Sequence, residues 1–346
     1  MQLKLAFIGF GNVAREFARL LASRQTLLNE IYGVQWRTTG IATHRHGSII
    51  TDSDIDLMEA TERVERHHQL SGISDITEIT DAEELIQRAD ADIIFETTPL
   101  SPLDGEPATT YIRAALRLGI HVITANKGPI ACAYHELQSL AEKQAAKFHF
   151  EGTVMDGTPI FNLHRFGLPA TEILGFSGVL NSTTNVILSA MEAGSTFAEG
   201  LLEAQQLGVA EANADYDIDG WDAGVKAIAL ANVLMNAELH PRNLSPTGIR
   251  EVTLKAVQSA RAAGKTIRLI ARAERRGEKV EIQVAPEITN VGSLFATLQG
   301  TSSALSITTD LMGEISLVEH HPKLRQTAYA LLSDMLSIHR QLSGKF

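Results

Sequence analysis

The N-terminal segment constrains the fold more than any other part of the chain. An apolar run over residues 4–8 is followed at once by the pattern Gly9-x-Gly11-x-x-Ala14 and by a helical stretch to about Ser23. The first glycine permits a tight turn, the second lets a pyrophosphate approach the backbone, and the small alanine lets the helix pack closely on the strand. The N-terminus of the helix favours the anion. This order of elements predicts a dinucleotide-binding unit. The residues expected beside the cofactor are Gly9, Phe10, Gly11, Asn12 and Val13.

The first 150 residues alternate between strand and helix patterns. Further strands are expected at residues 34–43, 92–96 and 121–124, and further helices at residues 81–89 and 106–118. Such alternation predicts an α/β fold with a parallel sheet covered by helices on both faces. The polar stretch from residue 43 to about residue 72 is expected to be mobile.

The pattern changes after about residue 150, where strands of a largely antiparallel sheet are expected. These strands cover residues 172–180, 267–273, 279–284, 303–309 and 313–318, with helices at 197–207 and 221–235. A closing amphipathic helix is expected over residues 326–338. The chain is therefore predicted to have a dinucleotide-binding domain and an α+β substrate and dimerisation domain. Their expected bounds are residues 1–150, with the C-terminal helix of about 322–346 packed back on this domain, and residues 151–321.

Composition limits the classes of partner and the cellular compartment. The formal net charge of −11 argues against a nucleic acid or an anionic membrane as partner, since phosphate binding needs an excess of Lys and Arg. Cys132 is the only cysteine, so an intramolecular disulfide is impossible. No apolar run approaches the roughly 18 to 20 residues that span a bilayer, and the N-terminus does not resemble a signal peptide. We therefore expect a cytoplasmic protein that binds a small-molecule substrate.

The end of the second expected strand bears on the choice of cofactor. It reads Thr43-His44-Arg45-His46, with no carboxylate to accept the ribose 2'-hydroxyl of NAD. Glu30 has about the usual spacing but precedes the strand. Arg45 could instead bind the 2'-phosphate of NADP, so the sequence favours NADP, with NAD as the alternative. A solvated basic loop without a cofactor role also fits these residues.

Residues 211–226, EANADYDIDGWDAGVK, combine five acids with a lysine. Asp215, Asp217, Asp219 and Gly220 match the first, third, fifth and sixth positions of an EF-hand loop. The last position of that loop must be a bidentate carboxylate, but here it is Lys226, which argues against calcium. Asp222 and Lys226 lie four residues apart, on one helix face. On the residues alone they could be a solvated ion pair worth about 0.3 to 0.5 kcal/mol.

With these motifs the chain resembles homoserine dehydrogenases of the short kind, which lack a regulatory domain. The resemblance extends over nearly the whole chain and implies NAD(P)-linked interconversion of L-homoserine and L-aspartate 4-semialdehyde, in the biosynthesis of threonine and methionine. The segments that carry it are residues 9–13 (GFGNV), 104–107 (DGEP) with 112–116 (IRAAL), 122–129 (VITANKGP), 208–212 (GVAEA) and 217–222 (DIDGWD) with Lys226.

The resemblance also implies roles for individual residues. Lys226 matches the proposed proton donor or acceptor, Glu211 and Asp222 would hold the amino acid, and Glu211 would face its ammonium group. The Thr98 backbone would lie near the nicotinamide, and Gly208 would contact the cofactor. The other acids of this stretch are expected to be loop and helix-start acids, with Asp217 in a solvated loop and Asp219 as a helix cap.

A second lysine is also a candidate for proton transfer. Lys127 follows the carboxyl end of a parallel strand, where open α/β sheets bind ligands, so it is also expected to contact the cofactor. A lysine suits proton transfer because its pKa falls readily on burial or beside another cation. A surface lysine in a turn is the simpler alternative for Lys127.

In three segments this chain has other residues where the family usually has glycine. They are residues 153–159 after Glu151, Ser182 before a Thr-Thr-Asn run, and residues 319–323 (EHHPK) before the last helix. The family's monovalent-cation site, for an ion such as sodium, falls on the first segment. Its ligands here would be Glu151, Val154, Asp156 and Thr158. Bulky side chains in the third segment could narrow the pocket on the nicotinamide side.

Two other functions are compatible with the sequence. The lost glycines favour a paralogous NAD(P)-dependent dehydrogenase of another small hydroxy or amino acid. A nucleotide-binding sensor without turnover is opposed by the set Lys127, Glu211, Asp222 and Lys226, because a sensor needs no proton transfer. A homodimer through the second domain is expected, because the sheet after residue 260 lacks an obvious covering layer and the resemblance points the same way.

Overall fold

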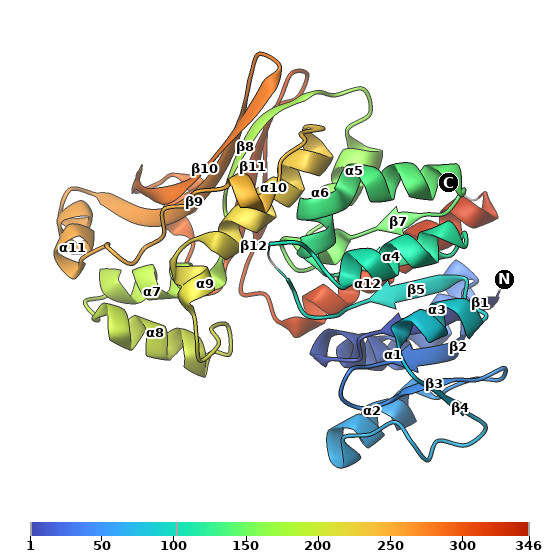
Figure 1. The fold of residues 1–346 in the computed structure, drawn as a ribbon. Helices are drawn as coiled ribbons and strands as arrows, with labels where there is room; N and C mark the ends of the chain where they lie inside the picture. The colour runs from blue at the N-terminus through green and yellow to red at the C-terminus, as the bar shows by residue number, and fades with distance from the viewer. Residues whose placement is uncertain (1, 102, 345–346) are drawn as a thin grey trace. The chain divides into compact units, whose positions relative to one another are not determined.

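The computed structural model describes residues 2–101 and 103–344, which form two compact units. The first unit comprises residues 1–159 and 323–346, and the second comprises residues 160–322. Figure 1 shows the elements of each unit. In the described part of the chain, no helix is both long enough and apolar enough to cross a membrane.

The first unit contains a seven-stranded sheet in the order β4-β3-β2-β1-β5-β6-β7. Five adjacent strands run parallel, as the alternating pattern predicted. They are β1 (Gln2–Ile8), β2 (Gln35–Ala42), β5 (Ile93–Glu96), β6 (His121–Thr124) and β7 (Phe148–His149). The chain moves outward from β1 to β2 and in the opposite direction from β5 to β7. Right-handed crossovers therefore place the connecting helices on both faces of the sheet.

The segment after residue 43 contains regular elements that the sequence pattern did not predict. It forms the antiparallel strands β3 (Ser48–Ile50) and β4 (Thr77–Ile79), with α2 (Leu57–His67) between them. The side chain of Asp56 caps α2 by accepting bonds from the backbone of Met58 and Glu59. The missed signal is helical periodicity, since the buried positions of α2 are Leu57, Ala60, Thr61 and Val64.

The remaining helices of the first unit build one core with the parallel strands. They are α1 (Asn12–Tyr32), α3 (Ala82–Arg88), α4 (Ala108–Arg117), α5 (Lys127–Lys143) and α12 (Leu324–Ser343). The rings of Phe7 and Phe95 stack with centroids 5.0 Å apart. The C-terminal helix α12 contributes Leu331 and Met335 to the same core and packs against α1. The closing helix of the chain therefore belongs to the dinucleotide-binding unit.

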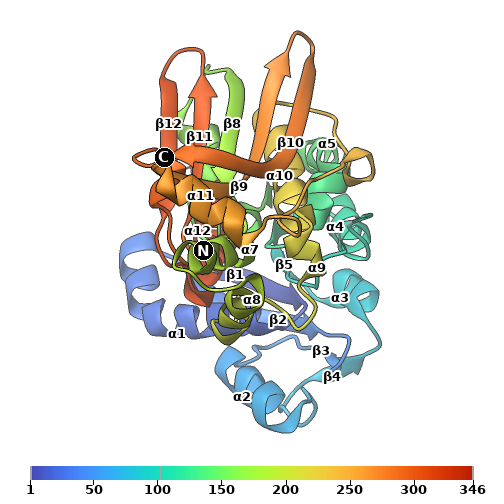
Figure 2. The ribbon, with the colours of Figure 1, turned by 90° about the vertical axis from the view of Figure 1, so that its left-hand side faces the viewer.

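The second unit contains a five-stranded antiparallel sheet in the order β10-β9-β8-β11-β12. The antiparallel arrangement agrees with the prediction, and Figure 2 shows these strands side by side. The strands are β8 (Ile173–Val179), β9 (Lys265–Arg276), β10 (Lys279–Asn290), β11 (Ser303–Thr309) and β12 (Gly313–Glu319). The helices are α6 (Ile160–Asn162), α7 (Ser182–Glu192), α8 (Phe197–Gln206), α9 (Asp215–Ile218), α10 (Trp221–Leu234) and α11 (Leu254–Ala262). Of these, α7, α10 and α11 contact β9.

Candidate active site

The glycine turn between β1 and α1 has the geometry that a pyrophosphate needs. Gly9 adopts a left-handed φ of 86°, and a Cβ there would lie 2.8 Å from the carbonyl carbon of Thr97. A Cβ on Gly11 would meet no atom within 4 Å, so the space over the start of α1 is open. The backbone N–H of Gly9 donates to the carbonyl of Ala42 (2.9 Å), which ends β2. Residues 9–13 therefore form an open helix N-terminus at the carboxyl edge of the sheet.

The ends of β5 and β6 bring Thr98 and Lys127 to the same edge. Lys127 is the first residue of α5, which directly follows β6. The side chain of Asn126 caps α5 by accepting the N–H of Gly128 (3.0 Å), and its amide donates to the carbonyl of Thr98 (3.2 Å). Since β1, β5 and β6 are adjacent and parallel, the glycine turn, Thr98 and Lys127 share the edge where such sheets bind ligands.

Glu96, the last residue of β5, is a site feature that sequence reasoning missed. Its side chain is completely buried, and it accepts bonds from the backbone N–H of Thr98 (2.8 Å) and the hydroxyl of Thr124 (2.7 Å). Burial raises the pKa of Glu96, and the threonine donors oppose that rise. The signal in the sequence was an acid at the end of a wholly apolar strand.

Arg45 lies exposed in the turn between β2 and β3. The backbone N–H of Thr43 and the carbonyl of Gly47 close this turn (3.2 Å). His46 Nδ1 lies 2.9 Å from the carbonyl of His68, which ties the turn to the end of α2. Because Ala42 contacts Gly9, the turn with Arg45 follows the strand end that borders the glycine turn.

In the second unit, Lys226 and Asp222 form a largely buried ion pair on α10. Lys226 Nζ lies 3.0 Å from Asp222 Oδ2 and donates to the carbonyl of Leu180 (2.8 Å) at the end of β8. The two side chains are only 17% and 10% exposed. The spacing of four residues therefore places both on one helix face, as predicted, but the pair is not solvated.

Asn181 extends this pair to a third charged residue, Asp217. The Asn181 amide nitrogen lies 2.9 Å from Asp222 Oδ2 and 2.7 Å from Asp217 Oδ1. The hydroxyl of Thr183 lies 3.0 Å from Asp217 Oδ2. Burial raises the pKa of Asp217, and the negative charge of Asp222 raises it further. The expectation that Asp217 is a solvated loop acid is therefore wrong.

The other two acids of this stretch face a different partner. Arg250 donates to Asp215 (2.5 Å), the first residue of the short helix α9, and to Asp219 (2.8 Å), which follows its last residue. Asp219 does not cap α10, because Gly220 occupies the cap position with φ 85°. Two of the acids that match the calcium-loop pattern, Asp215 and Asp219, are therefore paired with the guanidinium of Arg250. Within the described residues, no group of three or more His, Cys, Asp and Glu side chains could hold a metal ion.

Glu211 and Gly208 lie on the exposed segment that follows α8. Gly208 has φ 74°, a conformation that favours glycine. Within the described part of the chain, the Glu211 side chain makes no hydrogen bond or ion pair with another residue, and its carbonyl accepts a bond from Gln205 (3.3 Å). Glu211 therefore makes no contact of this kind with Asp222 or Lys226 among the described residues.

Two of the segments that lost glycine keep the backbone conformation that glycine favours. Asp156 has φ 45° and His321 has φ 49°. Left-handed backbone costs a residue with a side chain about 1 to 2 kcal/mol, so the conformation is retained at some expense. Ser182, the third departure, begins α7, and its hydroxyl donates to the carbonyl of Thr301 (3.0 Å).

The residues expected to bind a monovalent cation lie in one turn of the first unit. Glu151 is buried, and its backbone N–H donates to Asp334 of α12 (2.8 Å). The Asp156 carboxylate accepts the hydroxyl of Thr327 (2.8 Å), also on α12. Val154 is buried, and the backbone N–H of Thr158 closes the turn on the Met155 carbonyl (2.8 Å). The turn is thus held to the C-terminal helix at both of its ends.

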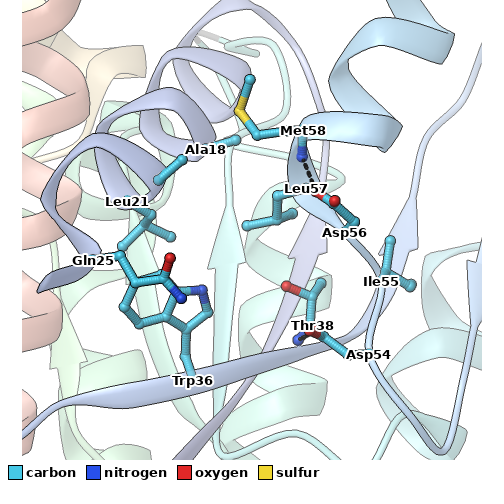
Figure 3. Close-up of a pocket in the computed structure, with 11 residues that line it drawn as sticks. Ala18, Leu21, Gln25, Trp36, Thr38, Asp54, Ile55, Asp56, Leu57 and Met58 are labelled. Carbon is cyan, nitrogen blue, oxygen red and sulfur yellow. Dashed lines mark hydrogen bonds between the residues drawn. The ribbon is translucent and has the colours of Figure 1, made fainter. Parts of the chain in front are cut away.

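A cavity of about 330 Å³ in the first unit lies away from the glycine turn. Figure 3 shows it between α1, β2 and the segment before α2. Trp36 and Thr38 line it from the first half of β2, whereas the glycine turn contacts Ala42 at the other end. The two carboxylates that line it both accept hydrogen bonds from backbone N–H groups. Asp54 accepts the N–H of Thr38, and Asp56 accepts the N–H of Met58 at the start of α2. This cavity is therefore not the dinucleotide site.

The open glycine turn at the carboxyl edge of a parallel sheet, joined in one chain to a buried lysine–carboxylate pair, defines an NAD(P)-dependent oxidoreductase. Comparison with known proteins gives the family. The homoserine dehydrogenase NAD-binding domain matches residues 9–151, and the homoserine dehydrogenase family model matches residues 159–336. The chain belongs to the homoserine dehydrogenase family.

Relatives and solved structures cover nearly the whole chain. The NAD(+)-dependent homoserine dehydrogenase of Pseudomonas canavaninivorans is 35% identical over 99% of this chain and 98% of its own. The homoserine dehydrogenase of Methanocaldococcus jannaschii is 32% identical over 97% of this chain and 98% of its own length. A hyperthermophilic archaeal homoserine dehydrogenase in complex with NADPH superimposes with a TM-score of 0.81, 31% identity and 97% coverage of both chains. The structure of a homoserine dehydrogenase from Thiobacillus denitrificans superimposes with a TM-score of 0.84 at 26% sequence identity. The match covers 99% of this chain and 74% of that chain.

Proposed function

We propose that the protein interconverts L-homoserine and L-aspartate 4-semialdehyde, with Lys226 as the group that exchanges the substrate proton. The observation that carries this proposal is the buried pair of Lys226 and Asp222. NAD(P) held by the glycine turn would supply the hydride acceptor for the oxidation of the alcohol, and Lys226 would take the hydroxyl proton. We further propose that this reaction serves threonine and methionine biosynthesis in the cytoplasm.

The surroundings of Lys226 suit a proton-transfer group. Its Nζ is fixed by Asp222 Oδ2 and by the Leu180 carbonyl, so the amine can hold one position relative to a substrate. A positioned acid–base group of this kind contributes about 10² to 10⁴ in rate. Lys127 is the second candidate, because it begins α5 at the edge of the sheet that carries the glycine turn.

The acids around Lys226 suit a substrate with an ammonium group. Asp222 and Asp217 share one amide of Asn181, which places two carboxylates beside the lysine. Glu211 lies exposed on the preceding loop, and we propose that it faces the ammonium of the amino acid. An acidic surrounding of this kind favours an amino acid over a simple hydroxy acid.

The substrate class can be tested with the purified protein. Formation of reduced cofactor would be followed with L-homoserine and with a panel of hydroxy acids that lack the amino group. We expect L-homoserine to give the highest kcat/KM, with the hydroxy acids at least about a hundredfold lower, as for a lost charged contact. Higher activity with another substrate would favour the paralogous dehydrogenase. Cofactor binding without turnover of any substrate would favour the nucleotide sensor.

We propose that NADP is the preferred cofactor and that Arg45 selects it. The support is an exposed guanidinium in the turn after β2, at a strand end without a carboxylate. One similar structure is described with NADPH, whereas one relative is named for NAD(+), so family membership alone leaves the choice open. The glycine turn suits the pyrophosphate of either cofactor.

We also propose that the turn containing Glu151, Val154, Asp156 and Thr158 binds a monovalent cation such as sodium. Its support is the buried position of Glu151 and the hydrogen bonds that hold Glu151 and Asp156 to α12. Replacing sodium by a bulky organic cation at constant ionic strength should lower both the melting temperature and the activity. Unchanged values of both would contradict this site.

A homodimer through the second unit is our proposal for the assembly. Leu174, Ile288 and Val318 lie on strands β8, β10 and β12 and are 39%, 64% and 37% exposed. Apolar side chains exposed on a sheet favour association with another surface. Light scattering at micromolar concentration should give the mass of a dimer, and a monomer mass would refute the proposal.

A further inference from the structure

Glu96 stands at the centre of the hydrogen bonds that join the strand ends of the first unit. It ends β5, and its side chain has no exposed surface. Burying a carboxyl group is unfavourable compared with an apolar side chain of similar size. The hydrogen bonds of Glu96 show which groups this buried carboxylate holds in place.

The first arm of this network reaches Thr98. Glu96 Oε1 accepts both the backbone N–H (2.8 Å) and the hydroxyl of Thr98. The carbonyls of Thr98 and Pro99 in turn accept the amide of Asn126 (3.2 and 3.4 Å). The backbone around Thr98 is thus held from both sides, by a carboxylate and by an amide.

The second arm reaches the start of α5. Glu96 Oε2 accepts the hydroxyl of Thr124 (2.7 Å), and Thr124 Oγ1 accepts the backbone N–H of Asn126 (2.9 Å). Asn126 caps α5 through its bond to Gly128 (3.0 Å). Lys127 lies between Asn126 and Gly128, so this arm sets the backbone from which its side chain leaves.

A third connection runs to the glycine turn through Thr97, which lies between Glu96 and Thr98. The hydroxyl of Thr97 donates to the carbonyl of Gly9 (2.9 Å), and its backbone N–H donates to Ile8 (2.8 Å). A Cβ at Gly9 would lie 2.8 Å from the Thr97 carbonyl carbon. The position of Thr98 is therefore coupled to that of the glycine turn.

We infer that Glu96 is a positioning residue for hydride transfer, which fixes the Thr98 backbone against the nicotinamide and the first turn of α5 relative to it. This inference rests on the proposed function. The carboxylate accepts all three hydrogen bonds, from one amide and two hydroxyls. Glutamine at this position keeps the size but turns one acceptor into a donor, so the arm to Thr124 cannot form as it stands.

The test uses Glu96→Gln and the matched pair Thr124→Val and Thr124→Ser. Serine keeps the hydroxyl that bonds Glu96 and Asn126, whereas valine removes it. Thr39→Val is the control, because Thr39 is equally buried, but among the described residues its hydroxyl bonds only the Leu5 carbonyl (3.3 Å). For each variant we would measure kcat, KM, the Kd of NADPH, the fluorescence of the bound nicotinamide and Tm.

We expect Glu96→Gln to lower kcat roughly 10- to 100-fold, the effect of a misplacement on the order of 1 Å. The Kd of NADPH should change less than about threefold, because the glycine turn and Arg45 supply most of the cofactor contacts. Thr124→Val should lower kcat in the same way, and Thr124→Ser should restore it. The double variant Glu96→Gln/Thr124→Val should be no worse than Glu96→Gln alone, since both changes remove one shared contact.

Two results would overturn the inference. One is a wild-type kcat in Glu96→Gln, and the other is an equal loss of kcat in Thr39→Val at the same loss of Tm. If Glu96→Gln does not fold, the comparison of kcat between Thr124→Val and Thr124→Ser tests the inference instead. If the wild type oxidises no homoserine, the proposed function fails separately. Glu96 is then tested by the fluorescence of bound NADPH, which should change in Glu96→Gln and Thr124→Val but not in Thr39→Val or Thr124→Ser.

Discussion

The cofactor edge of the first unit and the lysine network of the second are built from different materials. At the cofactor edge, the expected pyrophosphate position is formed by the main chain, through the left-handed turn at Gly9 and the open start of α1. In the second unit, Asp217, Asp222 and Lys226 are arranged by their side chains around one amide of Asn181. The glycine turn therefore depends on the absence of a side chain at Gly9, whereas the pair of Asp222 and Lys226 depends on the side chains that surround it.

The acids of residues 215–222 show the same contrast on a smaller scale. Asp215 and Asp219 share the half-exposed Arg250, and they hold α9 to the chain that follows α10. Asp217 lies between them in the sequence but faces Asn181 and Thr183. Neighbouring acids of the same type thus differ in burial, in partner and in expected effect on turnover.

The largest effect is expected for Lys226→Ala. If Lys226 exchanges the substrate proton, kcat should fall by roughly 10² to 10⁴, the usual contribution of a general acid–base group. The Kd of NADPH, measured by fluorescence titration, should barely change, because the glycine turn and Arg45 lie in the other unit. Lys127→Ala is the comparison variant. A wild-type kcat in Lys226→Ala would leave Lys127 as the remaining candidate.

The next largest effect is expected for Arg45→Ala. Losing a charge-assisted phosphate contact costs about 1.5 to 3 kcal/mol, so the Kd of NADP should rise roughly ten- to a hundredfold. The Kd of NAD, which lacks the 2'-phosphate, should stay nearly unchanged. Titration of both cofactors checks this prediction, and equal losses for both would reject the assignment of Arg45.

A smaller effect is expected for Asp217→Asn. The variant keeps the shape of the side chain but removes one negative charge beside Asp222, so we expect KM for L-homoserine to rise about tenfold. Asp215→Ala serves as the control. A KM within twofold of the wild type would show that Asp217 has no part in binding the substrate.

The pH dependence of stability checks the burial of Asp217 independently. Its raised pKa means that the folded protein holds this proton more tightly than the unfolded chain does. The stabilisation is complete below the ordinary pKa of aspartate, about 3.9, and is lost as the pH rises through the raised value. As the pH rises above about 4, the Tm of Asp217→Asn should therefore fall less than that of the wild type. A constant difference in Tm would contradict this.

The smallest effect is expected for Asp215→Ala. Asp215 and Arg250 are 61% and 50% exposed, and exposed ion pairs contribute only about 0 to 1 kcal/mol. We expect kcat and KM to change by less than about twofold. Added calcium should not raise Tm in either the wild type or the variant. A calcium-dependent rise in Tm would revive the calcium-loop interpretation.

The sequence predicted the features that depend on local geometry. The glycine turn, the alternation of strands and helices and the one-face spacing of Asp222 and Lys226 are all properties of short segments. The roles of Glu96 and Asp217 could not be predicted in this way, because they depend on contacts with Thr124 and Asn181, each far away in sequence. The helix α2 was missed for a different reason, since its charged positions obscured a regular apolar face.

Chemical rescue of Lys226→Ala tests the proton-exchange role most directly. Small primary amines would be added to the variant, and the rate of NADP reduction by L-homoserine would be measured at constant pH and ionic strength. If Lys226 exchanges the substrate proton, turnover should rise with amine concentration and with the basicity of the amine. If the variant has lost turnover and no amine restores any of it, Lys226 acts through charge or structure alone, and the proposed proton exchange is wrong.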